Sequence, residues 1–476
     1  MKKFVGLCAL AVAVALVAVP AFAEVQNVKV SGDIAVKAIS KDNWDLRKTT
    51  PGTLTNDDKF QGYLQTTGVR VDADLTDNVS AAVKLLNQRF WDTDSAISND
   101  VDLELAYVKL KELVYSPLTV TVGRQDLKFG TGFIVGPGLL GDPNGLFAGT
   151  SATTTTVHAA GQAREYSAVN GYDAIRLTLD YAPLTFDYIL AKIQERGEGG
   201  HDQDLMGANF NWKGAPVDRW QGEAELYWFW KNDRAAGVVL HDNPGRTYEN
   251  NQVHTIGLRT AGQPVSNLWL NAEGAIQLGR LQDTALVAGQ GAQSRDRLAL
   301  AADLSANYTF ANAAWTPNLG LGWTYFSGEH AGGARDGDVV GAWDVMYRGS
   351  FKTAIQDFLG GTDEPGGLYT TFDPNDTSAT TNRHLLYFDV GAKPLQDLAL
   401  QARYTHAWFA KVPVSGRSSS AGDEVDLQAK WDYTEDVQLG LLGAAFLPGK
   451  YYDGAAVATR GRNAAWEVTG DLSVKF

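Results

Sequence analysis

Apolar and polar residues alternate one by one through the end of the chain, from Trp466 to Phe476. Such a strand has one face suited to hydrocarbon and one suited to water, and it ends on an aromatic residue. Both properties are typical of the closing strand of an outer-membrane β-barrel. Because the strands of a two-sheet sandwich alternate in the same way, this segment alone leaves both folds open.

The start of the chain indicates export. Lys2 and Lys3 precede an apolar stretch, and the small residues of Ala21-Phe22-Ala23 follow it. This pattern predicts a secretory signal peptide over residues 1–23 that is cleaved after Ala23, which leaves residues 24–476 as a single barrel domain. The only cysteine, Cys8, lies inside the signal, so we expect no disulfide and no cysteine-ligated metal in the mature protein.

No apolar run beyond the signal approaches the roughly 18 residues that a membrane-spanning helix requires. The composition includes 50 Gly, 18 Tyr, 19 Phe and 13 Trp but only 3 Met, which suits a barrel with aromatic girdles at both membrane surfaces. The formal net charge of −14 argues against nucleic acid as a partner. If the chain is in a membrane, it must cross it as strands.

The alternation of apolar and polar residues with a period of two predicts about 18 antiparallel strands, with 16 as the alternative count. The connections between them alternate between long or polar ones, such as 130–171 and 328–381, and tight ones, such as Thr76-Asp77-Asn78 and Ala182-Pro183. Long external loops and short periplasmic turns alternate in this way in bacterial barrels, so we expect both termini in the periplasm. The sequence therefore predicts an all-β transmembrane barrel in the bacterial outer membrane.

A barrel of this width leaves an aqueous lumen. Along each strand, alternate residues face lipid (the lipid or outward parity) and the lumen (the polar or inward parity). Charged side chains should lie on the inward parity, since placing an Arg or Lys at the lipid midplane costs about 2–4 kcal/mol. The inward set comprises Lys37, Arg70, Asp72, Asp74, Lys84, Asp102, Glu104, Arg176, Asp180, Glu223, Glu225, Asp303, Arg403, Lys430, Asp432, Glu467 and Asp471. The simplest interpretation of any one of them is that it solvates and cross-links the inner wall.

One region carries a family resemblance. Residues 120–130 read VTVGRQDLKFG, residues 133–136 read FIVG, and residues 171–177 read GYDAIRL. This resembles the alginate-export family of outer-membrane barrels, in which a Gly-Arg-Gln strand and an aliphatic-Gly segment lead to an aromatic-Asp-x-aliphatic-Arg strand. The resemblance implies an 18-stranded pore for an anionic uronate polymer. It also implies that Arg124 and Arg176 are lumenal cations.

Strict alternation from Leu118 places Arg124 on the lipid parity, so its lumenal role requires a β-bulge, which we expect at Gly123. The inward set also holds more carboxylates than cations, whereas a path for a polyanion should concentrate positive potential. The predicted lumen cations are Lys37, Arg70, Lys84, Arg124, Arg176, Arg403 and Lys430.

Two long connections are candidates for narrowing the pore. The 328–381 connection contains Trp343, Tyr347, Phe351, Phe358 and Tyr369, which suggests packing, and such loops can fold into a barrel. An external cap and a disordered loop are the alternatives. The 130–171 connection is the second candidate.

The sequence contains no motif that predicts an enzyme. The Gly-rich stretch from Gly136 to Gly141 has a dinucleotide-binding spacing, but no helix pattern follows it. The seven histidines show no metal-ligand spacing, and we expect no catalytic residues, cofactor or metal.

The predicted function is a channel through which solutes diffuse. The alternative is a loop-plugged surface barrel that acts as a receptor, adhesin or structural envelope component. Expected partners are outer-membrane lipid and lipopolysaccharide, the barrel assembly machinery through the strand ending at Phe476, and anionic polysaccharide or small solutes. The solute, the direction of transport and the oligomeric state stay open.

Overall fold

The structure is a computed structural model. It describes residues 26–44, 46, 59–91, 101–137, 165–194, 202–214, 221–234, 238–239, 247–284, 293–328, 339–358, 381–412, 416–453 and 462–476. The predicted signal peptide and its cleavage site lie outside the described residues. No helix in the described ranges is long and apolar enough to cross a membrane.

The chain forms one antiparallel sheet of 20 strands, of which β10 and β15 have only 2 residues each. The remaining strands number 18 and form a closed barrel. In chain order the strands are β1 (Asn27–Asp42), β2 (Phe60–Thr76), β3 (Val79–Phe90), β4 (Asp102–Lys111), β5 (Leu118–Gln125), β6 (Tyr172–Tyr181), β7 (Leu184–Gln194), β8 (Gln203–Lys213), β9 (Gln221–Asp233), β10 (Val238–Val239), β11 (Thr247–Val265), β12 (Leu268–Thr284), β13 (Gln293–Thr309), β14 (Asn318–Phe326), β15 (Val339–Val340), β16 (Arg383–Ala392), β17 (Leu398–Phe409), β18 (Ser420–Asp432), β19 (Val437–Pro448) and β20 (Ala465–Lys475), with a 3-10 helix η4 (Lys450–Tyr452) before the last strand.

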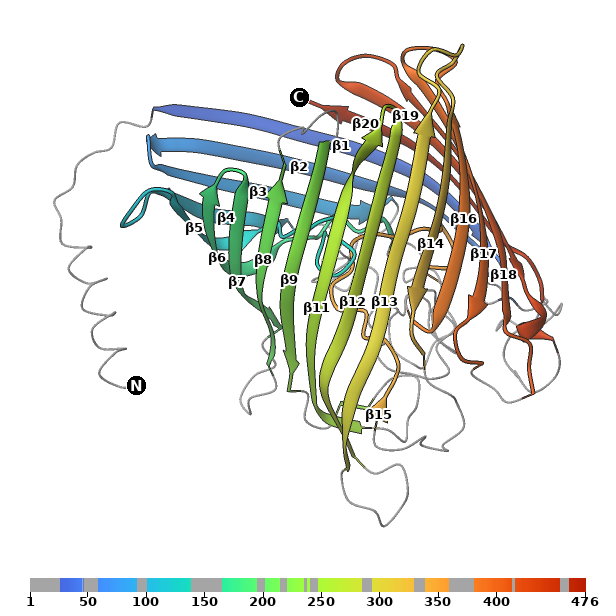
Figure 1. The fold of residues 1–476 in the computed structure, drawn as a ribbon. Coiled ribbons are helices and arrows are strands. Elements are labelled where there is room, and N and C mark those ends of the chain that lie inside the picture. Colours follow the sequence, from blue (N-terminus) through green and yellow to red (C-terminus); the bar gives the residue numbers. More distant parts are fainter. Residues whose placement is uncertain are drawn as a thin grey trace.

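Each long strand pairs with the next one along the chain, as Figure 1 shows. The first and last strands then close the ring, because β1 pairs with β20 from Asp33↔Lys475 to Asp42↔Trp466. This closure confirms the predicted strand count and the predicted role of the final strand, and it excludes the sandwich. The connections at one end are tight, such as Thr76 to Val79 and Val265 to Leu268; we call this the turn end, and the opposite end the loop end.

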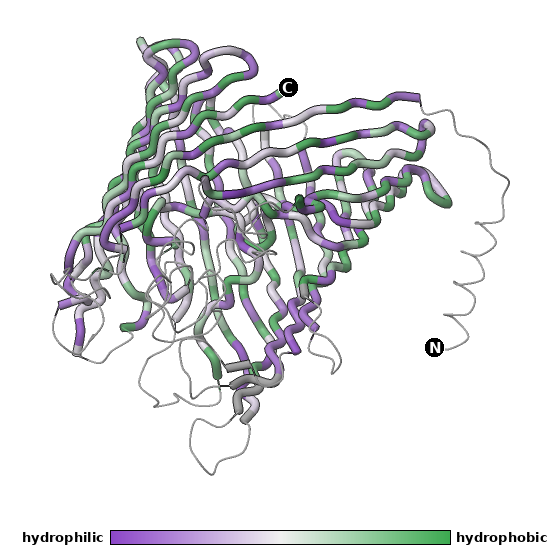
Figure 2. The backbone as a smooth tube through the Cα atoms, turned by 180° about the vertical axis from the view of Figure 1, so that it is seen from behind, coloured by the Kyte–Doolittle hydropathy of each residue, from purple (hydrophilic) through white to green (hydrophobic). Residues whose placement is uncertain are grey.

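The two faces of the wall differ as the alternation predicts. Apolar side chains such as Val69, Leu258 and Leu427 point outward and are exposed, while their strand neighbours point into the barrel. Figure 2 shows the resulting alternation of hydrophilic and hydrophobic residues along the strands. An outward apolar band is what the hydrocarbon of a bilayer requires.

Three connecting segments fold into the barrel instead of extending beyond it. Residues 126–137 and the first part of 341–358 pack with the inner wall in one cluster that includes Leu127, Phe133 and Trp343. The second part of 341–358 packs with the wall in another cluster, through Ile355 and Phe358. The third segment, residues 165–170, places Tyr166 against a smaller cluster on β1, β2 and β3. The described parts of both candidate loops therefore narrow the lumen.

Folding inward requires β5 to end early. The predicted connection begins at Gly130, but β5 already ends at Gln125, within the Gly-Arg-Gln motif. Leu127 and Phe129 alternate as strand residues do, yet they are buried inside the barrel. Their apolar side chains pack in the lumen because the inward segments provide a second layer there.

Candidate functional site: the lumen and its inner segments

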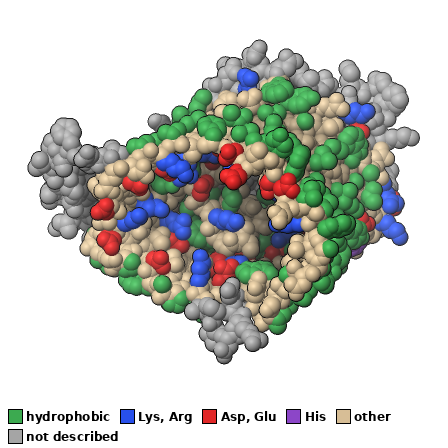
Figure 3. Space-filling model, turned by 90° about the horizontal axis from the view of Figure 1, so that it is seen from above, with side chains coloured by type: hydrophobic (Ala, Val, Ile, Leu, Met, Phe, Trp, Pro, Cys, Tyr) green, Lys and Arg blue, Asp and Glu red, His purple; other side chains and the backbone are tan. Residues whose placement is uncertain are grey.

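A water-accessible vestibule remains between the inner wall and the inward segments at the turn end. Its cavity of about 740 Å³ is bounded by β1–β4, β20 and parts of the 126–137 and 165–170 segments. Its charged lining side chains are Asp33, Arg70, Lys84, Glu104, Asp126, Lys128 and Lys475. Viewed toward the turn end, Figure 3 shows Lys, Arg, Asp and Glu side chains around a hollow and hydrophobic side chains outside it.

Six of the seven predicted lumen cations lie on the inward parity, and five of them pair with carboxylates. The pairs are Lys37–Asp471 (3.4 Å), Arg70–Asp72 (2.8 Å), Lys84–Asp33 (3.5 Å), Arg176–Asp187 (2.8 Å) and Arg403–Asp389 (2.6 Å). The sixth, Lys430, is exposed and forms no ion pair with a described carboxylate. Most of these cations thus cross-link the wall, as the simplest interpretation holds.

Arg124 does not line the lumen. The expected bulge at Gly123 is absent, because β5 pairs with β4 and β6 without a register shift at this residue. Arg124 therefore stays on the outward parity, opposite Ala106 and Asp173, and forms an ion pair with Asp173 at 3.4 Å. Gly123 has a φ of +121°, a backbone conformation that favours glycine. This conformation does not change the side of the sheet to which Arg124 points.

Two neighbours of Arg124 hold the start of the inward segment. The Gln125 amide donates to the carbonyl oxygens of Gly123 (3.1 Å) and Ala174 (2.9 Å), at the point where the chain leaves the wall. The Tyr172 hydroxyl donates to the Gly136 carbonyl oxygen at 2.7 Å. Gln125 and Tyr172 both belong to the residues that carry the family resemblance, but the sequence alone does not predict this anchoring role.

Asp344 fixes one end of the 341–358 segment to the wall. Its carboxylate accepts from Lys231 Nζ at 3.0 Å and from Asn251 at 3.0 Å, and its backbone exchanges hydrogen bonds with the Gln277 side chain. Burial acts to raise the pKa of Asp344, but Lys231 and Arg297 outweigh it and the pKa is lowered. The carboxylate is therefore charged where the segment meets the wall.

The other end of the segment is held through its backbone. The Glu424 carboxylate on β18 accepts the N–H groups of Ile355 (2.7 Å) and Gln356 (2.9 Å). Lys352 pairs with Asp303 at 3.1 Å. Carboxylates that accept backbone N–H groups form strong hydrogen bonds in a water-poor interior.

The 165–170 segment is bound beside the closing seam. Glu165 pairs with Lys41 of β1, and the Tyr166 hydroxyl donates to Glu467 of β20. Burial raises the pKa of Glu165 to about 7, against the opposing effect of Lys41. Burial also raises the pKa of Tyr166 well above its ordinary value. This segment therefore links the first and last strands from inside the barrel.

The sequence profile of the family described as Alginate export matches residues 45–465. The chain belongs to the alginate-export family. No curated protein matches it significantly. Family and fold together are those of transport porins of the bacterial outer membrane, which are not enzymes.

Solved structures share the fold of this alginate-export barrel. OccAB1 of Acinetobacter baumannii is 12% identical over 95% of this chain and 99% of that chain, with a TM-score of 0.54. A BenF-like porin of Pseudomonas fluorescens Pf-5 is 11% identical over 95% and 99%, with a TM-score of 0.51. OccK2 (OpdF) of Pseudomonas aeruginosa, solved in complex with glucuronate, is 12% identical over 95% and 98%, with a TM-score of 0.50.

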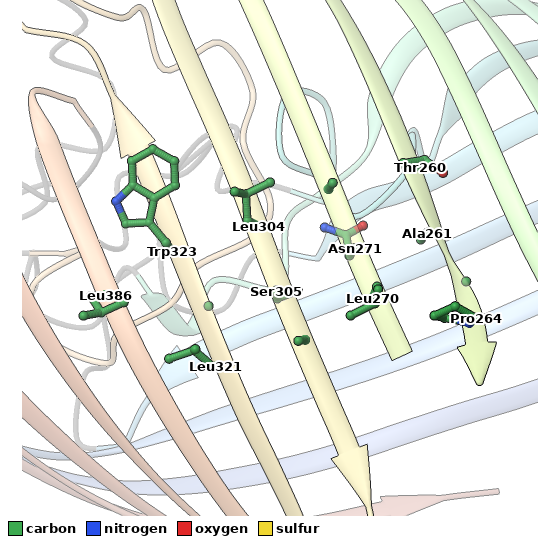
Figure 4. A pocket seen from close by; sticks show the side chains of 14 residues that line it. Thr260, Ala261, Pro264, Leu270, Asn271, Leu304, Ser305, Leu321, Trp323 and Leu386 are labelled. Carbon is green, nitrogen blue, oxygen red and sulfur yellow. The ribbon is translucent and has the colours of Figure 1, made fainter. Parts of the chain in front are cut away.

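The alginate-export barrel also carries a groove on its outward face. This groove of about 470 Å³ crosses β11–β14 and β16 and is lined by apolar side chains, among them Leu304, Leu321 and Leu386 (Figure 4). These leucines are exposed on the outward parity. Lipid chains suit such a surface, so the groove is not a candidate for the solute path. The described residues contain no group of three or more His, Asp or Glu side chains that could hold a metal ion.

Proposed function

We propose that this member of the alginate-export family is an outer-membrane channel that passes an anionic polysaccharide or its uronate units through the vestibule, with both termini in the periplasm. The proposal places the turn end toward the periplasm, because short turns occupy that side of bacterial barrels. Passage occurs by diffusion, and the charges along the path select the solute.

The observation that carries the proposal is the pair of lysines in the vestibule. Lys128 and Lys475 both line this cavity, both are exposed, and neither forms an ion pair with a described carboxylate. Arg70 and Lys84 line the same cavity. A carboxylate-bearing sugar would meet ammonium groups there whose charge is not already used by the wall.

Two comparisons support an anionic solute. The family is named for alginate export, and alginate is a polymer of uronates. OccK2, which shares the fold, was solved with glucuronate. Both point to a solute that carries carboxylates.

The test is ion selectivity and block by oligouronates in planar bilayers. We expect conducting steps, an anion-shifted reversal potential in a salt gradient, and block by oligouronates. The Lys128→Gln/Lys475→Gln double variant should lose most of the anion shift and bind oligouronates at least about a hundredfold more weakly, since each of the two charge-assisted hydrogen bonds contributes about 1.5–3 kcal/mol. Lys192→Gln is the matched control, because Lys192 lies on the outward parity with Asp202 and Asp204.

A second candidate function is favoured by a specific observation. The inward segments form two buried hydrophobic clusters with the inner wall, as a plugged receptor or structural barrel would require. Protein that inserts into bilayers without conducting and does not bind oligouronates would reject the channel and favour this alternative.

A further inference from the structure

The 126–137 and 341–358 segments are joined to each other by backbone hydrogen bonds. The N–H of Gly136 donates to Tyr347 O, that of Tyr347 donates to Ile134 O, and that of Gly349 donates to Gly132 O, at 3.0, 3.0 and 2.8 Å. Val135 and Tyr347 form a parallel β-bridge. Two loops that lie far apart in sequence thus share a short ladder inside the lumen.

Glycines allow the two backbones to touch. A Cβ on Gly136 would lie 2.9 Å from Gly132 Cα and 3.2 Å from Gly349 Cα, and one on Gly349 would lie 2.8 Å from Pro137 N. Side chains at these positions would force the segments apart. The contact is therefore a close fit of backbone against backbone.

The segments also share one hydrophobic cluster. Phe133, Ile134 and Val135 of the first segment and Trp343 and Met346 of the second are buried together. Separating the segments would expose these side chains to the water-filled lumen, at about 1.5–3 kcal/mol for each large apolar side chain. The segments consequently hold each other by apolar burial as well as by hydrogen bonds.

The attachments to the wall are apolar as well as polar: Phe133 of the first segment and Trp343 of the second both pack against Phe326 of β14, with ring centroids 5.5 and 6.2 Å from that of Phe326. The first segment is held by the Tyr172 hydroxyl on Gly136, and the second by the charge contacts of Asp344 and by Glu424. Polar contacts can be exchanged for contacts with water when the segment moves, at a net cost of about 0.5–1.5 kcal/mol each. Because both segments share one apolar cluster with the wall, displacing one segment alone would expose side chains of the other to water.

We propose that residues 126–137 and 341–358 form a single plug that leaves the wall as one body when the pore opens. The inference rests on the proposed channel function, since it describes how that channel is opened. Tyr172 and Glu424 are positioning residues in this scheme: they hold the plug against the wall and do not touch the solute.

The test measures whether releasing one segment also releases the other. Val135 and Ile355 are both 0% exposed, so Val135→Cys and Ile355→Cys each report opening of their own segment through reaction with a water-soluble maleimide. Cys8, the only native cysteine, is replaced by serine. Each reporter is combined with Tyr172→Phe, which removes the bond to the first segment, or with Glu424→Gln, which weakens the hold on the second.

We expect each release variant to speed the modification of both reporters by a similar factor of about three to ten, the effect of one lost hydrogen bond. Gln438→Ala is the matched control, because it loses the 2.7 Å bond between Gln438 and Asp432, away from both segments. Faster reaction only at the reporter on the released segment would show that the segments move separately. Unchanged rates at both reporters would show that the inner segments are a fixed constriction. Either result overturns the proposal.

A separate readout distinguishes this inference from the proposed function. Single-channel conductance is recorded on the same variants, and more frequent opening in both release variants is expected. If neither variant ever conducts while both reporters still respond together, the channel function fails and the joined plug stands.

Discussion

Gly123 has a backbone conformation that a residue with a side chain rarely adopts. Its φ is +121°, and a Cβ there would overlap the Ala106 carbonyl oxygen on the neighbouring strand. We predict that Gly123→Ala lowers the free energy of unfolding by about 1–3 kcal/mol, measured by urea titration in detergent micelles. Gly274→Ala is the control: nothing lies within 4 Å of its Cβ position, and we expect a change near zero. Equal losses in the two variants would contradict this explanation of Gly123.

Asp344 gives a prediction with a defined pH range. Its folded-state pKa lies below the ordinary value of about 3.9. A lowered pKa means that its stabilising contribution is complete above the ordinary value and is lost as the pH falls through the folded-state pKa. We therefore expect the unfolding free energy of the wild type to exceed that of Asp344→Asn by about 3–5 kcal/mol, the cost of breaking a buried ion pair.

The difference between wild type and Asp344→Asn should be constant from pH 8 to about pH 5 and decrease only below about pH 4. Urea titrations of both proteins at pH 8, 6, 4 and 3 check this. A difference that already decreases between pH 8 and pH 6 would show that the charge of Asp344 is not what holds the segment.

Arg124 shows what the sequence alone leaves undecided at the scale of a residue. The period-two pattern correctly placed it on the lipid parity, and the family motif suggested the opposite. Only the pairing register, with Arg124 opposite Ala106 and Asp173, decides between them. A glycine with positive φ looks the same in sequence whether it starts a bulge or not.

The seam between β1 and β20 carries ion pairs at two inward pairs of residues that face each other. These pairs are Lys37↔Asp471 and Lys41↔Glu467. A shift of the seam by one inward pair would separate both of them, so the charges favour the observed register.

The seam pairs should differ in their contribution to stability. Lys41 and Glu467 are fully buried, whereas Lys37 and Asp471 are about a quarter exposed. We predict a loss of about 3–5 kcal/mol for Glu467→Gln and of about 0.2–1 kcal/mol for its matched control Asp471→Asn, both from urea titration. A larger loss in Asp471→Asn would reverse the assignment of the strong pair.

At the scale of elements, the wall strands were predictable and the inner layer was not. Strand positions follow from period-two alternation, which the two environments of a barrel wall impose on every strand. The inward segments obey no such repeat. Phe129 and Phe133 pack against Phe229 of β9 and Phe326 of β14 and share one buried cluster with residues of the distant 341–358 segment. No local pattern records these contacts.

At the scale of the whole molecule, the inward segments should limit the width of the pore. Deletion of residues 341–358 removes the inner layer beside β11–β18 while leaving the wall pairings in place. We expect a severalfold larger single-channel conductance and an unchanged folded barrel, measured by bilayer recording and by resistance to unfolding in detergent. Equal conductance with and without the segment would show that ions already pass beside it.

The strand number and the closed ring were predictable because the chain shows the pattern of every strand and of the connections between them. The vestibule was not, since its lining combines wall residues from β1–β4 and β20 with Lys128 from an inward segment. A site assembled from such separate parts exists only after the whole ring has formed.

Lys37 and Asp471 are separated by 434 positions in the chain and still face each other across the seam. Strand β1 therefore cannot pair with β20 until the end of the chain has been synthesised. Until then, β1 and β19 are two open sheet edges with unpaired N–H and C=O groups, the kind of surface that invites aggregation. Pairing over so long a separation is entropically costly and slow, so we expect this protein to be most vulnerable to aggregation and proteolysis between its synthesis and the arrival of its final residues at the seam.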